Sequence, residues 1–346
     1  MNYRTPEGRA AKVREAKEAL LASRSASLTT HINADGDGAA SEAALSSWLR
    51  ANGTEAWIIN PTPFPEAFHF AVEDERWIVP AGSARARDLC EQADLAVVLD
   101  TGEVPRIGRT RDLIRKLRTV VIDHHQPGEQ PIGSISLRDP AAAATGELVY
   151  DVVLAANGPW TEYVALGIYV AILTDTGSFR FSNTTPETHM MAADLLDRGV
   201  DSEDVYSRIY GRASLRKYQL LGAALETLAN DEEYGIAWMT VPTDAYETLG
   251  ANAEDIEGMV DVPRSIEGNK IALLFRQATT GGIKISFRSS GPVNVNELAR
   301  QFGGGGHIKA SGAMVDGPLE RAIREVLRAA RKMIARDLSE VLEEDG

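Results

Sequence analysis

Short apolar runs alternate with amphipathic stretches in the first half of the chain. Apolar runs typical of β-strands lie at residues 27–32, 57–59, 95–99 and 120–122. Apolar positions with helical spacing predict helices at residues 5–22, 38–51, 109–118 and 161–173. This alternation favours β-α-β units on one parallel sheet. We therefore predict an α/β domain over residues 1–200, whose ligands bind beyond the carboxyl ends of the strands.

A second alternating region follows a charged segment. Thr185 and Pro186 predict the start of a helix, and the charged stretch at 201–225 predicts one connecting helix within a linker at residues 201–226. Beyond this linker, strand-like runs and a final long helix are predicted at 235–242, 270–277, 281–290 and 319–342. We interpret residues 227–346 as a smaller α/β domain.

Composition narrows the class of protein. The 346 residues suffice for two domains. The net charge of −14 argues against a long groove for polymeric nucleic acid, which needs clustered Lys and Arg. The first residues lack the apolar core of a signal peptide, and no later stretch is apolar enough for a membrane span. We expect a cytoplasmic protein.

Cysteine usage limits the metal chemistry that the chain can support. Cys90 is the only cysteine, so an intramolecular disulfide and a cysteine-based zinc cluster are both excluded. Any bound metal must therefore be held by oxygen atoms and imidazole rings.

Candidate metal ligands first appear at the end of the strand-like run at residues 27–32. His31, Asp35 and Asp37 lie within seven residues, in a turn that contains glycine. Any one of these aspartates is common as a turn residue or helix N-cap. Three potential ligands together favour a metal site over that structural role.

The same pattern recurs at three further segments. Asp100 ends an apolar run, the triplet Asp123, His124 and His125 ends another, and Asp175 follows a predicted helix. Consecutive histidines point in different directions, so one can bind a metal while its neighbour faces a substrate. The predicted metal ligands are His31, Asp35, Asp37, Asp100, His124 and Asp175.

Charge balance suggests how many ions such a set holds. Its four carboxylates match the four positive charges of two divalent cations. Ligation by oxygen and imidazole without thiolate favours two Mn²⁺ ions, with Co²⁺, Mg²⁺ or Zn²⁺ as less favoured occupants.

A glycine run in the second domain is a candidate substrate site. Glycines that end a helix are common as C-caps. Four consecutive glycines at 303–306 instead suggest close approach of a ligand, because backbone N–H groups can cradle a phosphate. The predicted substrate-binding residues are Gly304, Gly305, Gly306, His307, Arg288 and, as a stacking partner for a nucleobase, Phe179.

The order of these motifs resembles the DHH phosphoesterase superfamily. Its motifs match His-Ile-Asn-Ala-Asp-Gly-Asp-Gly from His31, Leu-Asp-Thr-Gly at residues 99–102, Asp-His-His at 123–125 and Thr-Asp-Thr-Gly at 174–177. Residues 284–313 resemble the DHHA1 module, which binds substrate in this superfamily. The resemblance implies a parallel-sheet DHH domain, a smaller α/β DHHA1 domain and an active site in the cleft between them.

The resemblance also implies a role for each residue. His31 and Asp35 would hold the first ion, Asp37, His124 and Asp175 the second, and Asp100 would bridge them. The catalytic residues would be Asp100, His125 beside the scissile phosphate, and Asp123, which orients a histidine. A homodimer is common for such folds.

Among subfamilies, the sequence is most similar to the NrnA-like oligoribonucleases and phosphoadenosine phosphatases. This resemblance implies hydrolysis of short 5′-phosphorylated oligoribonucleotides to mononucleotides, and of adenosine 3′,5′-bisphosphate to AMP. A phosphodiesterase for cyclic di-AMP or linear dinucleotides is the alternative. A catalytically inactive nucleotide sensor, an inorganic pyrophosphatase and a processive single-strand exonuclease are minor alternatives, and the acidic charge opposes the last.

Overall fold

The computed structural model divides into two compact units, Met1–Gly211 and Arg212–Gly346. Side chains are described as far as Arg336. The backbone is described over residues 3–211, 213–278, 281–306 and 308–344.

The first unit is built on a five-stranded parallel sheet in the order β2-β1-β3-β4-β5. This order has a switch point between β1 and β3, from which the chain winds outward in both directions. The strands are β1 (Ser25–Thr29), β2 (Glu55–Ile58), β3 (Leu95–Leu99), β4 (Arg118–Asp123) and β5 (Ile135–Arg138).

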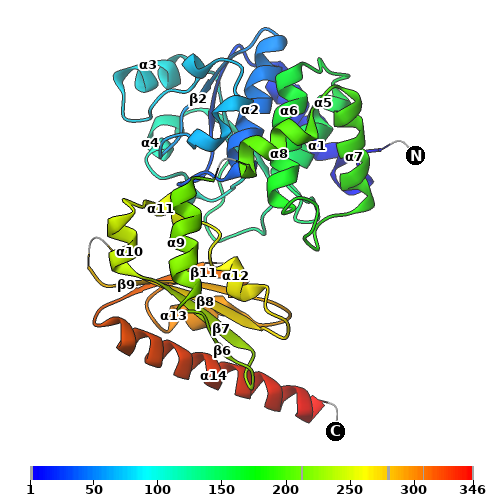
Figure 1. Ribbon diagram of the computed structural model, residues 1–346. Helices are drawn as coiled ribbons and strands as arrows, with labels where there is room; N and C mark the ends of the chain where they lie inside the picture. Colours follow the sequence, from blue (N-terminus) through cyan, green and yellow to red (C-terminus); the bar gives the residue numbers. More distant parts are fainter. Residues whose placement is uncertain (1–2, 212, 279–280, 307, 345–346) are drawn as a thin grey trace. The chain divides into compact units, whose positions relative to one another are not determined.

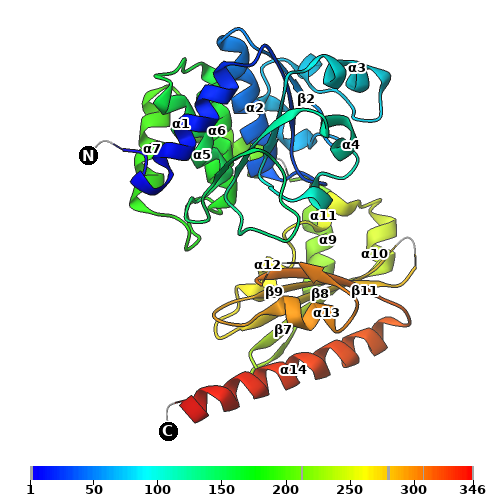
Figure 2. The ribbon, with the colours of Figure 1, turned by 180° about the vertical axis from the view of Figure 1, so that it is seen from behind.

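Helices cover both faces of this sheet (Figures 1 and 2). Alternate strand residues point to opposite faces, so Val97 packs in the large core with α1, α2, α5, α6 and α7, whereas Val98 packs toward α4. The helices are α1 (Glu7–Leu21), α2 (Gly36–Ala51), α3 (Ala84–Gln92), α4 (Thr110–Ile114), α5 (Thr145–Ala155), α6 (Glu162–Asp175), α7 (Pro186–Asp197) and α8 (Ser202–Tyr210). Three 3₁₀ turns are η1 (Glu66–Ala71), η2 (Glu75–Trp77) and η3 (Val104–Ile107).

The predicted α/β class of this unit is confirmed, and some of its elements were not predicted. β5, α3 and α5 had no counterpart in the sequence prediction. The first strand ends at Thr29, earlier than predicted, so His31 lies in the turn that follows. The predicted start of α7 is confirmed, because the Thr185 hydroxyl accepts from Thr188 N and Pro186 occupies the first turn.

The prediction of a single helix over residues 201–225 is wrong. The structure has two helices here, α8 and α9 (Leu215–Leu225). Gly211 follows α8, and the Ser214 hydroxyl caps α9 by accepting from Lys217 N at 3.1 Å. The two units divide between these helices, whereas the domain limits predicted at 200 and 226 stay predictions.

The second unit contains a six-stranded mixed sheet in the order β10-β11-β9-β8-β7-β6. Of its neighbouring pairs only β7 and β8 are parallel. Three of these strands match the predicted runs, and the small-residue strand β11 was missed. The strands are β6 (Ala229–Asp231), β7 (Ile236–Val241), β8 (Ile271–Gln277), β9 (Ile283–Ser289), β10 (Gly305–Gly306) and β11 (Ala310–Val315).

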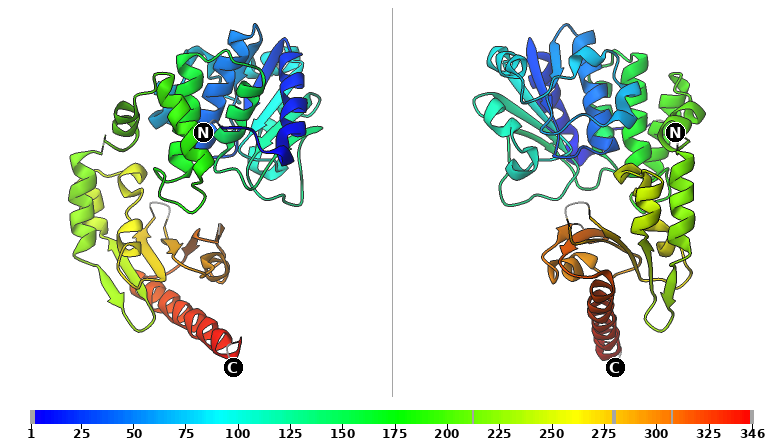
Figure 3. Two further views of the ribbon diagram at one scale, coloured as in Figure 1. Left: turned by 90° about the vertical axis from the view of Figure 1, so that its right-hand side faces the viewer. Right: turned by 60° about the vertical axis from the view of Figure 1, so that its left-hand side comes forward.

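Helices also cover both faces of the second sheet. Phe275 and Phe287 pack with α13 and α14 on one face, and Met239 and Leu274 pack with α9, α11 and α12 on the other. Figure 1 shows α14 extending along its side of the sheet, and Figure 3 shows the same helix from two further directions. The helices are α10 (Thr243–Thr248), α11 (Ala253–Ile256), α12 (Asp261–Arg264), α13 (Val295–Arg300) and α14 (Leu319–Glu344). None of the helices searched in the described part of the chain is long and apolar enough to span a membrane.

Candidate metal centre

The predicted ligands converge at the carboxyl end of the first sheet. His31 lies two residues beyond β1, Asp100 directly follows β3, and His124 directly follows β4. β1 and β3 flank the switch point of the strand order. At such a point the connections diverge to opposite faces, which leaves a crevice for ligands at the strand ends.

Seven side chains, the six predicted ligands and His125, form three overlapping groups of possible ligands, within each of which the candidate atoms lie no more than 4.8 Å apart. Asp100 belongs to two groups and His124 to two, so they link the three. The groups are His31, Asp35 and Asp100; Asp37, His124 and Asp175; and Asp100, His124 and His125. All six predicted ligands are thus brought together.

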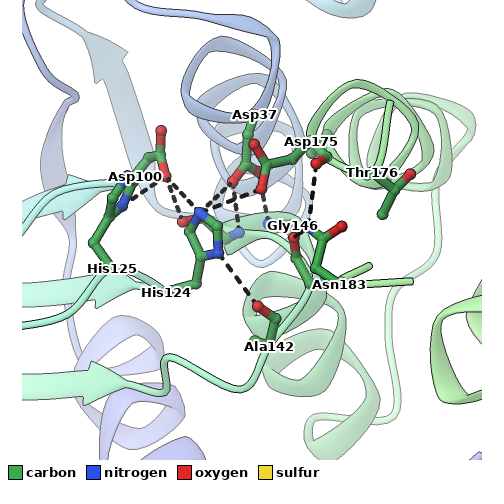
Figure 4. A network of polar contacts seen from close by, with 12 residues as sticks. Asp37, Asp100, His124, His125, Ala142, Gly146, Asp175, Thr176 and Asn183 are labelled. Atoms are coloured by element: carbon green, nitrogen blue, oxygen red, sulfur yellow. Dashed lines mark hydrogen bonds and ion pairs between the residues drawn. The ribbon is translucent and has the colours of Figure 1, made fainter. Parts of the chain in front are cut away.

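Figure 4 shows the second of these groups from close by. The Nε2 atom of His124 lies 3.6 Å from Asp37 Oδ2, 3.5 Å from Asp175 Oδ2 and 3.5 Å from Asp100 Oδ1. His124 Nδ1 faces the carbonyl oxygen of Ala142 at 3.3 Å. This second contact holds the ring so that Nε2 points at the carboxylates.

Backbone amides at the start of α5 hold the Asp37 carboxylate. Thr145 N donates to Asp37 Oδ2 at 2.6 Å and Gly146 N donates to Oδ1 at 3.0 Å. The Ser41 hydroxyl donates to Oδ1 at 3.1 Å, and the Thr145 hydroxyl donates to Asp100 Oδ1 at 3.0 Å. The unpaired N–H groups of a helix start favour a negative charge, so α5 keeps both carboxylates in place.

Carboxylates crowd one another in this group. Burial, together with the charges of Asp100 and Asp175, raises the pKa of Asp37 well above its usual range. Burial likewise raises the pKa of Asp175 to about 6, with Asp100 adding to the effect. Negative groups gathered in a buried position need compensating positive charge.

His31 faces the same carboxylates. Its Nε2 atom is buried and lies 3.2 Å from Asp100 Oδ2 without completing a hydrogen bond. Burial favours the neutral ring, but Asp100 and Asp35 outweigh it and raise the pKa of His31 to about 10. An incompletely paired ring nitrogen among crowded carboxylates fits a divalent cation, whose usual protein ligands include imidazole and carboxylate.

Asp123 orients the His125 ring. Asp123 Oδ1 accepts from His125 N at 3.0 Å and lies 2.9 Å from His125 Nδ1. Its second oxygen lies 3.2 Å from Arg138 Nε. Asp123 is buried, so its carboxylate fixes the direction of the His125 ring. Arg138 was not predicted from sequence.

Asn183 ties the Asp175 segment to the loop beside His124. Its Nδ2 atom donates to the carbonyl oxygens of Ala143 at 2.9 Å and Asp175 at 3.1 Å. Both carbonyls belong to backbone next to the metal-ligand candidates (Figure 4). Asn183 therefore helps to fix the distance between these two segments.

A buried polar pair supports the turn that carries His31. Asn60 Nδ2 donates to Glu42 Oε2 at 2.7 Å, and Asn60 Oδ1 accepts from Thr30 N at 3.1 Å. Sequence reasoning missed these two residues, Asn183 and the Thr145–Gly146 helix start. Only the last has a local signal, because Thr145 and Gly146 are the first two residues of the helical pattern of α5.

The predicted substrate-binding residues are divided between the units. Phe179 lies in the first unit, where its ring stacks on His189 at 5.2 Å between centroids. Arg288 is half-buried on β9 of the second unit. None of these residues belongs to the three groups of possible metal ligands.

The glycine run has a structural role of its own. A Cβ at Gly306 would lie 2.6 Å from Ala310 O, and one at Gly304 would clash with Gly312 O. Gly305 and Gly306 form β10, which pairs with β11. The close approach of β11 therefore requires glycine here, whether or not a ligand binds. His307 lies outside the described residues.

Comparisons with known proteins agree with the two-unit architecture. The DHH family N-terminal domain matches residues 26–172, and the DHHA1 domain matches residues 221–336. A Thermus thermophilus protein named bifunctional oligoribonuclease and PAP phosphatase NrnA is 34% identical over 89% of this chain and 90% of its own length. A Bacillus subtilis protein of the same name is 30% identical over 83% of this chain and 88% of its own.

Solved structures share the fold. An exopolyphosphatase-related protein from Bacteroides fragilis is 26% identical, with a TM-score of 0.87 over 94% of this chain and 97% of its own. RecJ of Thermus thermophilus, in complex with Mn²⁺, has a TM-score of 0.55 at 15% identity, over 96% of this chain and 55% of its own. Taken with the matches to both domains and to the Thermus relative, these findings show that the chain belongs to the DHH family, with a DHHA1 domain after its DHH domain.

Proposed function

We propose that this protein is a metal-dependent phosphoesterase. Its substrates would be short 5′-phosphorylated oligoribonucleotides, cleaved to mononucleotides, and adenosine 3′,5′-bisphosphate, converted to AMP. The observation that carries the proposal is the overlap of three groups of possible metal ligands through Asp100 and His124. Two relatives at 30% identity or more, both named bifunctional oligoribonuclease and PAP phosphatase, support the choice of substrates.

Two Mn²⁺ ions suit this donor set, with Co²⁺, Mg²⁺ or Zn²⁺ as other occupants. His31 and Asp35 would hold one ion, Asp37, His124 and Asp175 the other, and Asp100 would lie between them. Two bound cations lower the pKa of water and stabilise the oxygens of a phosphoryl group during displacement. The amides of Thr145 and Gly146 hold the Asp37 carboxylate in place and would keep it available to the ion.

The protein's own residues would orient the substrate. His125 would lie beside the scissile phosphate, where its ring donates a hydrogen bond to a phosphate oxygen. Asp123 holds that ring through Nδ1, and Arg138 holds Asp123. Despite burial, the carboxylate of Asp123 raises the pKa of His125, so the protonated ring can keep one N–H directed at Asp123 and offer the other, on Nε2, to the phosphate.

The second unit would bind the part of the substrate away from the reacting phosphate. Arg288 carries a positive charge that suits a terminal phosphate. The backbone N–H groups of Gly304, Gly305 and Gly306 suit the same anion. His307 would add a further donor. Arg288→Met and His307→Ala should therefore weaken substrate binding while leaving metal binding intact.

One incubation tests the proposal. The purified protein with Mn²⁺ is mixed with 5′-phosphorylated diadenylate, adenosine 3′,5′-bisphosphate and cyclic di-AMP, and the products are separated by chromatography. AMP from the first two substrates is the expected result, and Asp100→Ala should abolish it. Loss of cyclic di-AMP alone would instead identify the protein as a phosphodiesterase for cyclic dinucleotides. Tight nucleotide binding without turnover would identify a sensor. Cytoplasmic location and a homodimer stay predictions from sequence.

A further inference from the structure

A cavity of about 580 Å³, open to solvent along α8, lies in the first unit between the end of α6 and the helix α8. This volume is within the range of about 300 to 1,000 Å³ that is usual for small-ligand sites. Three aromatic side chains line it: Tyr169, Phe179 and Tyr206. None of the residues that line the cavity belongs to the groups of possible metal ligands.

Phe179 of this aromatic lining lies only four residues after the metal-ligand candidate Asp175. Ser178 and Phe179 both adopt left-handed backbone, with φ of 60° and 63°, which bulky residues rarely do. The Thr176 hydroxyl accepts from Phe179 N at 3.1 Å and stabilises this turn. The turn therefore couples the position of the Phe179 ring to that of Asp175.

Neighbouring rings hold Phe179 in one orientation. His189 stacks on it with an interplanar angle of 27°, and Tyr169 meets it edge-on at 6.3 Å between centroids. Tyr206 lies on α8 and is 53% exposed. A fixed ring together with a more accessible one is an arrangement on which a planar heterocycle can stack.

The polar groups of the cavity suit an uncharged ligand with N–H donors. Ser178, Ser202 and Ser207 contribute hydroxyls, and Glu203 contributes a carboxylate. Of the described residues that line the cavity, none is Lys or Arg. A carboxylate accepts hydrogen bonds and repels anions, so this lining disfavours a phosphate and favours a nucleobase edge that carries N–H groups.

We propose that this cavity binds a nucleobase of the substrate nucleotide, with Tyr206 and Phe179 as stacking partners and Glu203 as the acceptor for N–H donors. The inference rests on the proposed function, since it names the subsite that takes the base while the metal centre takes the phosphate. Guanine presents two adjacent N–H donors to a carboxylate, whereas uracil presents one. The subsite should therefore prefer guanine to uracil.

Tyr206→Ala is the variant that tests the stacking. Tyr206 is exposed, so its removal leaves the core intact. Tyr218 on α9 is 59% exposed and lies outside the cavity, so Tyr218→Ala is the matched control. Loss of one base-aromatic stack should raise the KM for 5′-phosphorylated diadenylate by about 5- to 150-fold, with kcat little changed. The KM for an abasic analogue of the same dinucleotide should stay unchanged.

Base binding is also measured without turnover. The fluorescence of 2-aminopurine riboside 5′-monophosphate falls when its base stacks on an aromatic ring. The wild type and Tyr218→Ala should quench this probe, and Tyr206→Ala should not. Glu203→Gln should reduce the ratio of affinities for GMP and UMP, because the amide has only one acceptor oxygen.

The outcomes separate this inference from the proposed function. Quenching that depends on Tyr206, without cleavage of the dinucleotide, would overturn the proposed activity and keep the base site. Cleavage with equal kinetics for Tyr206→Ala and the wild type would overturn the base site and keep the activity. An equal rise in KM for the abasic analogue would also overturn it.

Discussion

Replacing Asp100 by Asn tests whether the crowded carboxylates at the sheet edge form a cation site. Asp100 is buried, belongs to two of the three ligand groups and has left-handed backbone with φ of 57°. Asn tolerates that conformation and has nearly the same shape as Asp. It also keeps an acceptor for the Thr145 hydroxyl. The substitution therefore removes one negative charge with little change in packing.

The expected effect on stability depends on the metal. Without metal, Asp100 raises the pKa of Asp37, which disfavours folding, and also raises the pKa of His31, which favours it. These effects oppose each other, so the variant should differ little in stability from the wild type. With Mn²⁺ at 100 times its dissociation constant, each ion stabilises the folded wild type by about 2.7 kcal/mol. For a unit of this size that gain raises Tm by roughly 5 to 11 °C per ion.

Thermal unfolding measured in EDTA and in Mn²⁺ gives the Tm of each protein without metal and with metal. The wild type should gain the full shift in Tm, and Asp100→Asn should lose most of it. Asp112→Asn removes the same charge from an exposed position in the same unit, so it should behave as the wild type does. An Mn²⁺-dependent shift of equal size in Asp100→Asn would refute the assignment of these carboxylates to a metal centre.

Three further substitutions probe the structure around the site. Arg9→Met should lower the free energy of unfolding by about 3 to 5 kcal/mol in chemical denaturation, because the Arg9 side chain is 3% exposed and lies 2.6 Å from the Glu147 carboxylate. The control Arg24→Met changes a side chain that is 94% exposed, so it should lower the free energy of unfolding by less than about 1 kcal/mol. Burial raises the pKa of Glu42 to about 8, so the folded state binds more protons than the unfolded state between about pH 4.5 and 8. The wild type should therefore lose stability relative to Glu42→Gln as the pH rises through that range. Parallel profiles of stability against pH for the two proteins would contradict this. Asn183→Ala leaves two carbonyl oxygens without their donor, which should lower the free energy of unfolding by about 1 to 3 kcal/mol. Because the Asp175 segment loses a support, activity should also fall while far-UV circular dichroism stays unchanged. Full activity would show that Asn183 does not position the Asp175 segment.

Sequence alone identified the elements whose signal is local. The parallel-sheet class followed from the alternation of apolar runs and helical patterns, because strand and helix periods can be read directly from neighbouring residues. β5 and α5 were missed, since the run at 135–138 is short and the start of α5 follows four alanines. The break between α8 and α9 was also missed, because helical spacing continues on both sides of it.

The candidate site likewise has one part that the sequence determined and another that only the tertiary structure decided. The chain itself determined the donor chemistry, because each motif places an acid or histidine after an apolar run, and a single cysteine excludes a cysteine cluster. Tertiary structure decided which donors meet. The strand order 2-1-3-4-5 brings the ends of β1, β3 and β4 together, and the start of α5 supplies amides to Asp37. Such supports come from backbone groups and from side chains distant in sequence, and their positions depend on packing of the whole unit rather than on any local pattern.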